Sequence, residues 1–124
     1  MTDTVLIVDD SPSIRFSIST ILSKTHLDAQ TASSAEEALS LMQAGLRPHI
    51  LITDLHMGPM DGVELIRQTR KIPGLQFIPI LMLTTESHRA ERQEAKDAGG
   101  TGWLVKPVDG LKLLQLVAQL APES

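Results

Sequence analysis

A short apolar run that ends in a carboxylate constrains the fold of this chain more than any other feature. Residues 50–52 are Ile-Leu-Ile, and they lead through Thr53 to Asp54 before a turn-rich segment begins at Gly58. An unbroken apolar run of this length is typical of a strand buried on both faces of a parallel sheet. Ligands of open α/β sheets bind at the carboxyl edge of the strands. The sequence therefore predicts that Asp54 lies at a ligand-binding edge.

Similar runs alternate with helical patterns along the whole chain. We expect strands over residues 5–8, 27–31, 50–54, 77–83 and 103–105, separated by helices over about 12–22, 34–45, 62–70 and 87–98, with a last helix after residue 109. Such alternation is typical of a parallel sheet with helices on both faces. We predict a doubly wound, flavodoxin-like (βα)5 fold of class α/β. The strand order 2-1-3-4-5 places the runs ending in Asp9-Asp10, Asp54 and Thr84 side by side.

The ends and buried faces of the helices follow from local patterns. Ser11 before Pro12 and Asp109 are expected N-caps, and Ser34 with Glu37 fits a capping box. Gly45 is the expected end of the second helix. Apolar residues at helical spacing are expected to face the core: Ile14, Ile18, Ile21, Leu22, Ala35, Ala38, Leu39, Met42, Val63, Ile66, Leu113, Leu114, Val117 and Leu120.

Length and composition indicate one ordinary globular domain over residues 1–124, with no linker and no segment left for an output domain. The apolar content of 42% and the charged content of 21% are those of a soluble chain. No apolar run approaches a membrane span, and the first residues do not resemble a signal peptide, so we expect a cytoplasmic monomer. The net charge of −4 argues against nucleic-acid binding, and the absence of cysteine excludes disulfides and thiolate metal sites.

Three carboxylates converge if the sheet is arranged in this way. Two carboxylates about 4 Å apart repel by roughly 4 kcal/mol at an effective dielectric constant near 20. Lys106, at the end of the fifth strand, offsets one of the charges of Asp9, Asp10 and Asp54. A divalent cation would balance the rest. With oxygen ligands and only His56 near the strand ends, Mg²⁺ is favoured over zinc.

The same residues suit phosphoryl transfer. A carboxylate can act as a nucleophile and form an acyl phosphate. Phosphoryl transfer mainly needs positioning and positive charge around the phosphoryl oxygens, which Lys106 and a metal would supply, while the Thr84 hydroxyl can donate a hydrogen bond. The sequence lacks an evident separate acid or base and an evident substrate pocket, so a phosphoryl acceptor is favoured over a hydrolase.

Taken in register, these residues resemble the receiver domain of two-component response regulators. The resemblance rests on Asp9-Asp10, Asp54, Met57, Met60-Asp61-Gly62, Thr84 and Lys106-Pro107, and it covers essentially the whole chain. The residues 84–86 (Thr-Thr-Glu) and 102–107 (Gly-Trp-Leu-Val-Lys-Pro) are most similar to the stand-alone chemotaxis (CheY-like) type.

The resemblance implies a role for each residue. Asp54 would accept a phosphoryl group from a histidine kinase, with Mg²⁺ held by Asp10, Asp54 and the backbone carbonyl of His56, and with Asp9 assisting through water. Lys106 would pair with the phosphoryl group, and the peptide bond before Pro107 would be cis. Thr84 and Trp103 would switch on phosphorylation. The surface of the fourth helix, fifth strand and fifth helix would then bind a target such as a flagellar switch component.

Several residues depart from the usual family pattern. Gly58 stands between Met57 and Pro59, where proline usually follows the methionine directly, which predicts a more mobile loop. Thr85 could crowd access to the phosphoryl group. Trp103 replaces the more usual Tyr or Phe, and Val108 a frequent aromatic residue. These departures bear on rates and on the size of the switch.

Other readings stay open at this stage. Within signalling, the chain could drain phosphoryl groups from a shared kinase or pass them on in a relay. A Mg²⁺-dependent phosphohydrolase and a binding module that has lost the switch are less favoured. No glycine-rich nucleotide-binding motif occurs. His26, His49 and His88 are expected to be solvated, with the His56 imidazole pointing outward, and the polar 87–98 helix is a candidate docking surface.

Overall fold

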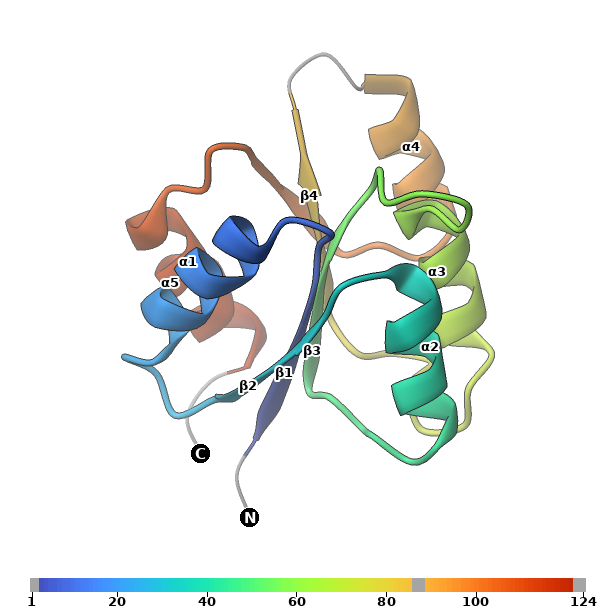
Figure 1. The fold of residues 1–124 in the computed structure, drawn as a ribbon, viewed down its shortest axis with the longest axis horizontal. Coiled ribbons are helices and arrows are strands. Elements are labelled where there is room, and N and C mark those ends of the chain that lie inside the picture. Colours follow the sequence, from blue (N-terminus) through green and yellow to red (C-terminus); the bar gives the residue numbers. More distant parts are fainter. Residues whose placement is uncertain (1–2, 86–88, 122–124) are drawn as a thin grey trace.

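The computed structural model describes residues 3–85 and 89–121. Five strands form one parallel sheet in the order β2-β1-β3-β4-β5, as predicted. The elements are β1 (Thr4–Val8), α1 (Pro12–Leu22), β2 (Asp28–Ala32), α2 (Ala35–Gln43), β3 (Ile50–Asp54), α3 (Gly62–Arg70), β4 (Ile80–Thr84), α4 (Arg89–Asp97), β5 (Gly102–Val105) and α5 (Gly110–Leu120). Helices α1 and α5 cover one face of the sheet, and α2, α3 and α4 cover the other (Figure 1).

Alternate side chains of the central strands point into two separate cores. On the α1–α5 face, Ile7 and Ile52 pack with Ile18 of α1 and Leu113 of α5. On the opposite face, Leu6, Leu51 and Met82 pack with Met42 and Ile66 from α2 and α3. Because β1, β3 and β4 are buried on both faces, they are apolar at nearly every position up to their ends.

The register brings the ends of these strands to one edge. Val8 of β1 lies opposite Thr53 of β3, and Asp54 lies opposite Leu83 of β4. Thr84 in turn lies opposite Val105 of β5. The residues that directly follow or end these strands are therefore neighbours in space, although they are far apart in sequence.

The helix ends agree with the expected signals, with one difference. The side chains of Ser11, Ser34 and Asp109 accept hydrogen bonds from backbone N–H groups of the first turns that they cap. Gly45 follows α2 with φ of 122°, a conformation that glycine adopts without strain. The Glu37 carboxylate, however, accepts from the N–H of Ser33 at 2.8 Å rather than from the cap residue itself.

Two expectations about apolar residues need correction. The strand expected over residues 77–83 begins only at Ile80, and Phe77 is 95% exposed. Pro79 lacks an N–H for the ladder, which accounts for the late start. In α5, Leu116 rather than Leu114 packs against the core with Leu113, Val117 and Leu120. Leu114 is turned about 100° from Leu113 and lies on the flank.

Of the histidines expected to be solvated, His49 has a side chain that is 51% exposed, in agreement with the expectation, whereas the His26 side chain is only 23% exposed. Both also contact Asp3, with their Nε2 atoms 3.4 Å (His26) and 3.3 Å (His49) from its carboxylate oxygens. His26, Asp3 and His49 precede β2, β1 and β3, so the strand order brings them together at the amino edge of the sheet. His88 lies outside the described residues.

Helix α4 is the least embedded helix, as its sequence predicts. Ala95 is the only buried residue between Arg89 and Asp97. The first two residues of the expected 87–98 helix lie outside the described residues. Within residues 3–85 and 89–121, no helix combines the length and the apolar character that crossing a membrane requires.

Candidate phosphoryl-acceptor site

Asp54 ends β3 and lies at the carboxyl edge of the sheet. The residue is 6% exposed. One carboxylate oxygen accepts a hydrogen bond from the backbone N–H of His56 at 3.3 Å, and the other lies 3.2 Å from Nζ of Lys106. Gly62 packs directly behind the carbonyl group of Asp54, where a side chain would collide with backbone. The strand end that carries Asp54 is therefore held by close packing of α3.

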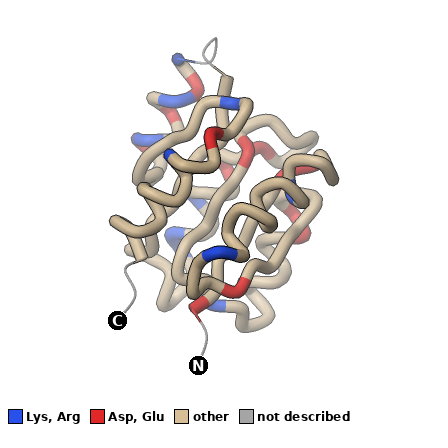
Figure 2. Tube along the Cα trace, turned by 90° about the vertical axis from the view of Figure 1, so that its left-hand side faces the viewer, with Lys and Arg blue, Asp and Glu red and all other residues tan. Residues whose placement is uncertain are grey.

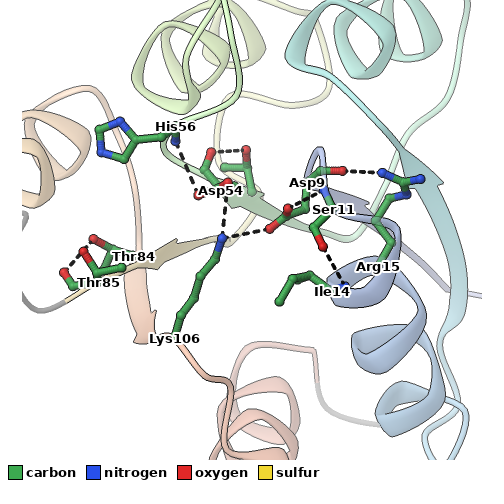
Figure 3. Close-up of polar contacts among 10 residues, drawn as sticks. Asp9, Ser11, Ile14, Arg15, Asp54, His56, Thr84, Thr85 and Lys106 are labelled. Atoms are coloured by element: carbon green, nitrogen blue, oxygen red, sulfur yellow. Dashed lines mark hydrogen bonds and ion pairs between the residues drawn. The ribbon is translucent and has the colours of Figure 1, made fainter.

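Asp9 follows β1 and is fully buried. Oδ1 accepts a hydrogen bond from the N–H of Ser11 at 2.9 Å, and Oδ2 lies 3.1 Å from Nζ of Lys106. The Arg15 guanidinium donates to the backbone carbonyl of Asp9 at 2.7 Å (Figure 3). Contacts from the start of α1 and from Lys106 after β5 thus fix the position of Asp9.

Carboxylate oxygens of Asp9, Asp10 and Asp54 lie within 4.8 Å of one another. Asp10 is exposed, whereas the other two are buried. Burial raises the pKa of Asp9, and the nearby charge of Asp54 raises it further, although the Ser11 N–H and Lys106 oppose the shift. The ionised cluster is therefore electrostatically costly. An all-oxygen set of this kind fits Mg²⁺, which binds through one or two carboxylates together with waters and phosphate.

Lys106 stands between two of these carboxylates. It follows β5, its backbone N–H donates to the Thr84 carbonyl at 2.7 Å, and the peptide bond that joins it to Pro107 is cis, as the resemblance implied. Burial alone would lower the pKa of Lys106, but the charges of Asp54 and Asp9 outweigh it, so the net shift is upward. The ammonium group therefore stays charged at neutral pH. In the described part of the chain, no other basic side chain pairs with either carboxylate.

Thr84 and His56 flank the cluster. Thr84 ends β4 and is 2% exposed, and its hydroxyl donates to the carbonyl of Thr85 at 3.1 Å. Figure 3 shows the hydroxyl beside Thr85 and the His56 imidazole pointing away from Lys106 and Asp54. The exposed Thr85 lines an open depression of about 590 Å³ together with Lys106, Pro107, Asp109 and Lys112. This depression lies beside Lys106, on the side of β5 and α5.

Trp103 lies on β5 and is 43% exposed. The Arg92 guanidinium carbon lies over its indole ring, 5.1 Å from the ring centroid. Such a cation–π contact contributes about 0.5–1 kcal/mol at an exposed position. The ring is therefore held outward, against α4.

Comparison with known proteins places the chain in a family. Residues 5–118 match the response regulator receiver domain. The chain is 36% identical over 104 residues to the chemotaxis protein CheY1 of Helicobacter pylori, covering 83% of this chain and 84% of that protein. It is 32% identical over 117 residues to the chemotaxis protein CheY of Pseudomonas aeruginosa, covering 94% of each.

Comparison with solved structures indicates the same family. The chemotaxis protein CheY4 of Vibrio cholerae superimposes with a TM-score of 0.89 at 39% identity, covering 97% of this chain and 99% of that chain. This chain belongs to the response regulator receiver domain family, and its similar relatives are CheY chemotaxis proteins. Receiver domains are components of two-component signalling that bind Mg²⁺ at an acidic pocket; they are not enzymes in the usual sense.

The sequence predicted that the three carboxylates and Lys106 lie close together, which the structure shows, but it missed two other contacts. The first is the hydrogen bond that the Arg15 guanidinium, in α1, donates to the backbone carbonyl of Asp9. The place of Arg15 four residues after the Ser11 cap could have suggested this contact, because that spacing brings a side chain back to the start of the helix. The stacking of Arg92 on Trp103 had no signal in the sequence, since it depends on how α4 is oriented against β5.

Proposed function

We propose that this chain is a phosphorylation-activated signalling protein in which Asp54 accepts a phosphoryl group from the phosphohistidine of a histidine kinase. The observation that supports this most strongly is the position of Lys106 Nζ, 3.1 Å from Asp9 and 3.2 Å from Asp54 at the open carboxyl edge of the sheet. A phosphoryl group on Asp54 would meet this cation directly. Positioning and positive charge are what phosphoryl transfer requires of a protein.

In the proposed reaction, a carboxylate oxygen of Asp54 forms a bond to phosphorus as the phosphorus–nitrogen bond of the donor phosphohistidine breaks. The electron pair of the broken bond goes to the imidazole nitrogen, which takes up a proton. Later attack of a water oxygen on phosphorus releases inorganic phosphate and restores the carboxylate. The backbone N–H of His56 and the ammonium group of Lys106 hold the acceptor carboxylate in place before transfer.

Asp10, Asp54 and the backbone carbonyl of His56 would hold Mg²⁺, with Asp9 assisting through water. When bound, the ion would offset the negative charge of the phosphoryl oxygens. The raised pKa of Asp9 and the closeness of the three carboxylates support a cation at this place. Lys106 offsets only part of their charge.

Thr84 and Trp103 would carry the signal outward. A phosphoryl group adds about −1.5 to −2 charges and strong acceptor oxygens. The Thr84 hydroxyl, which here donates a hydrogen bond to the Thr85 carbonyl, would turn and donate to the phosphoryl group instead. Trp103 would turn inward from its half-exposed position. The surface formed by α4, β5 and α5 would change shape as a result.

The relatives, which are chemotaxis proteins, support a role in chemotaxis. A flagellar motor component is the proposed target of that surface. A phosphate sink and a relay intermediate are the other outcomes for the same chemistry. The phosphate-sink and relay roles are distinguished from a motor-binding role by measuring whether the phosphorylated chain returns its phosphoryl group to a kinase.

A small phosphodonor tests the acceptor chemistry. Native chain incubated with phosphoramidate and Mg²⁺ is expected to gain the mass of one phosphoryl group and to change its fluorescence, which comes from the single tryptophan, Trp103. Asp54→Asn is expected to do neither. Glu36→Gln, which removes an exposed carboxylate of α2, is the matched control and should behave as native. Phosphorylation of Asp54→Asn at the native rate would contradict the proposal.

A further inference from the structure

Two histidines and one carboxylate meet at the amino edge of the sheet, opposite the edge that carries the acceptor site. Asp3, His26 and His49 precede β1, β2 and β3, and the strand order places Asp3 between the two histidines. Nε2 of His26 lies 3.4 Å from Oδ2 of Asp3, and Nε2 of His49 lies 3.3 Å from Oδ1. In Figure 2 this edge lies at the bottom, where the chain begins and acidic residues are drawn in red.

His26 contributes a buried nitrogen atom that lacks a hydrogen bond. In the part of the chain that the structure describes, its Nε2 atom is shielded from solvent and has no hydrogen-bond partner. The 3.4 Å contact with Asp3 is close enough for charge attraction but does not have the geometry of a hydrogen bond. A buried polar atom without a partner costs free energy, and an ion at this place is one explanation of such an atom.

The separations between these atoms match the ligand spacing of a tetrahedral zinc ion. Zinc binds imidazole nitrogen and carboxylate oxygen at about 2.0–2.2 Å, which at the tetrahedral angle places two ligand atoms about 3.3–3.5 Å apart. His26 and His49 contact different oxygens of Asp3, so the three groups do not yet surround one point. The half-exposed His49 side chain must turn toward His26 to complete the set.

The backbone around the three side chains is already held in place, so only this side-chain rotation is needed. The N–H of Asp28 donates to the Asp3 carbonyl, and the N–H of His49 donates to the Thr4 carbonyl, both at 2.7 Å. These two hydrogen bonds join the segments before β1, β2 and β3.

We propose that Asp3, His26 and His49 bind a zinc ion, with a water molecule as the fourth ligand. Two imidazole groups favour zinc over Mg²⁺, which prefers oxygen ligands only, so this site and the carboxylate cluster at the opposite edge select different metals. The ion would give the buried Nε2 atom of His26 a partner and would tie together the segments before three strands. This site is separate from the acceptor chemistry of Asp54.

Binding through Nε2 of His49 has a cost that also provides a signature. Its Nδ1 atom now accepts a hydrogen bond from the backbone N–H of Thr4 at 3.1 Å, so the proton of the neutral ring is on Nε2. A metal on Nε2 requires this proton to move to Nδ1, through solvent, and the Thr4 hydrogen bond must then break. Zinc should therefore shift the amide resonance of Thr4.

A zinc titration in the presence of saturating Mg²⁺ tests the site. Native chain stripped of metals with a chelator is expected to bind one zinc ion. His26→Gln/His49→Gln should bind zinc at least about a hundredfold more weakly, because it loses two of the three protein ligands, and the loss of an outer partner alone typically costs about 10–100-fold. Asp28→Asn is the matched control. It removes an exposed carboxylate opposite Thr4 in the ladder and should bind zinc as native chain does.

Nuclear magnetic resonance on native chain gives a second measurement that does not depend on how the variants fold. Zinc should shift the imidazole signals of His26 and His49 and the amide of Thr4, and should leave the amides around Asp54 in place. The proposal is overturned if native chain binds no zinc, if the double histidine variant binds it as tightly, or if the shifts centre on Asp54. The last two results would mean that zinc only competes for the carboxylate cluster.

Discussion

At the scale of single residues, Asp9 combines full burial with closeness to a second carboxylate. Its ionised form is held by Ser11 and Lys106 but costs stability, because burial and the charge of Asp54 raise its pKa. We therefore expect Asp9→Asn to stabilise the metal-free chain, by on the order of 1 kcal/mol. Urea unfolding in the presence of a chelator measures this, and Mg²⁺ should stabilise the variant less than it stabilises native chain.

The difference between Asp9→Asn and native chain should depend on pH with a defined sign. A carboxyl group with a raised pKa in the folded state binds its proton more readily when folded than when unfolded. The cost of the ionised group is therefore fully present above the folded pKa, is relieved as the pH falls through that value, and is absent below the unfolded pKa. The stability difference should shrink toward acidic pH. A difference that grows on acidification would contradict this assignment.

The position of a single residue could be predicted from the sequence only where the order of the strands determines that position. Asp9, Asp54, Thr84 and Lys106 end or follow strands, so the alternation of strands and helices was enough to bring them to one edge. Arg92 sits on a helix flank, and its contact with Trp103 depends on side-chain direction and helix rotation. His26 and His49 precede strands and meet Asp3 at the amino edge, so the strand order places them as well.

At the scale of secondary-structure elements, the start of α3 supports the site through Gly62. A methyl group there would collide with the Asp54 carbonyl and Leu55, so Gly62→Ala should destabilise the chain by about 2 kcal/mol and slow phosphorylation of Asp54. Gly110→Ala is the matched control, because it also replaces the first residue of a helix behind an Asp cap. Its added carbon would meet only Ile21, at ordinary contact distance. Equal losses in the two variants would exclude a specific role for the α3 contact.

Arg70 joins α3 to the turn that follows α4. Its guanidinium donates to the carbonyls of Gly99, Leu75 and Ile78, the last at 2.7 Å. Burial lowers its pKa, but an arginine remains charged at neutral pH. Arg70→Met would leave these carbonyls without their donor and should cost about 2–3 kcal/mol in urea unfolding, with faster amide exchange at Gly99 and Gly100.

The control for Arg70→Met is Arg67→Met, which removes an exposed arginine three residues earlier. Arg67 pairs with Glu64 at 3.6 Å on the helix surface. Surface pairs of this kind contribute at most about 1 kcal/mol, so this variant should unfold nearly as native chain does. If both variants lose the same stability, the loss belongs to α3 itself and the link to the α4 turn is unimportant.

Element boundaries were predictable where local chemistry decides them. Caps at Ser11 and Asp109 follow from side chains that reach the first free N–H groups, and both were found. The start of β4 was missed because an apolar run does not reveal which residues have a partner strand. Phe77 is as apolar as Leu81, but only Leu81 lies within the ladder. Leu114 was misplaced because α5 contains six leucine and valine residues, which fit more than one helix face.

At the scale of the whole molecule, the site links the ends of three strands, of which β5 is a neighbour of neither β1 nor β3 in the sheet. Lys106 after β5 contacts Asp9 after β1 and Asp54 of β3, so a ligand at this edge acts on the center of the domain. We expect Mg²⁺ at about 100 times its Kd to raise the free energy of unfolding by about 2.7 kcal/mol, because it binds only the folded chain. Thermal unfolding with Mg²⁺ and with chelator measures the effect. Amide exchange should slow in β1, β3 and β5 together.

The Asp54→Asn variant distinguishes stabilisation by Mg²⁺ bound at the carboxylate cluster from a general effect of salt. The variant loses one carboxylate of the cluster, so its stabilisation by Mg²⁺ should fall to a small fraction of the native value, whereas Glu36→Gln should keep it. Equal stabilisation of all three chains would mean that the ion acts away from the cluster. Slower exchange confined to the loops around Asp54 would mean that the ion orders the site locally, without tightening the three strands that the site connects.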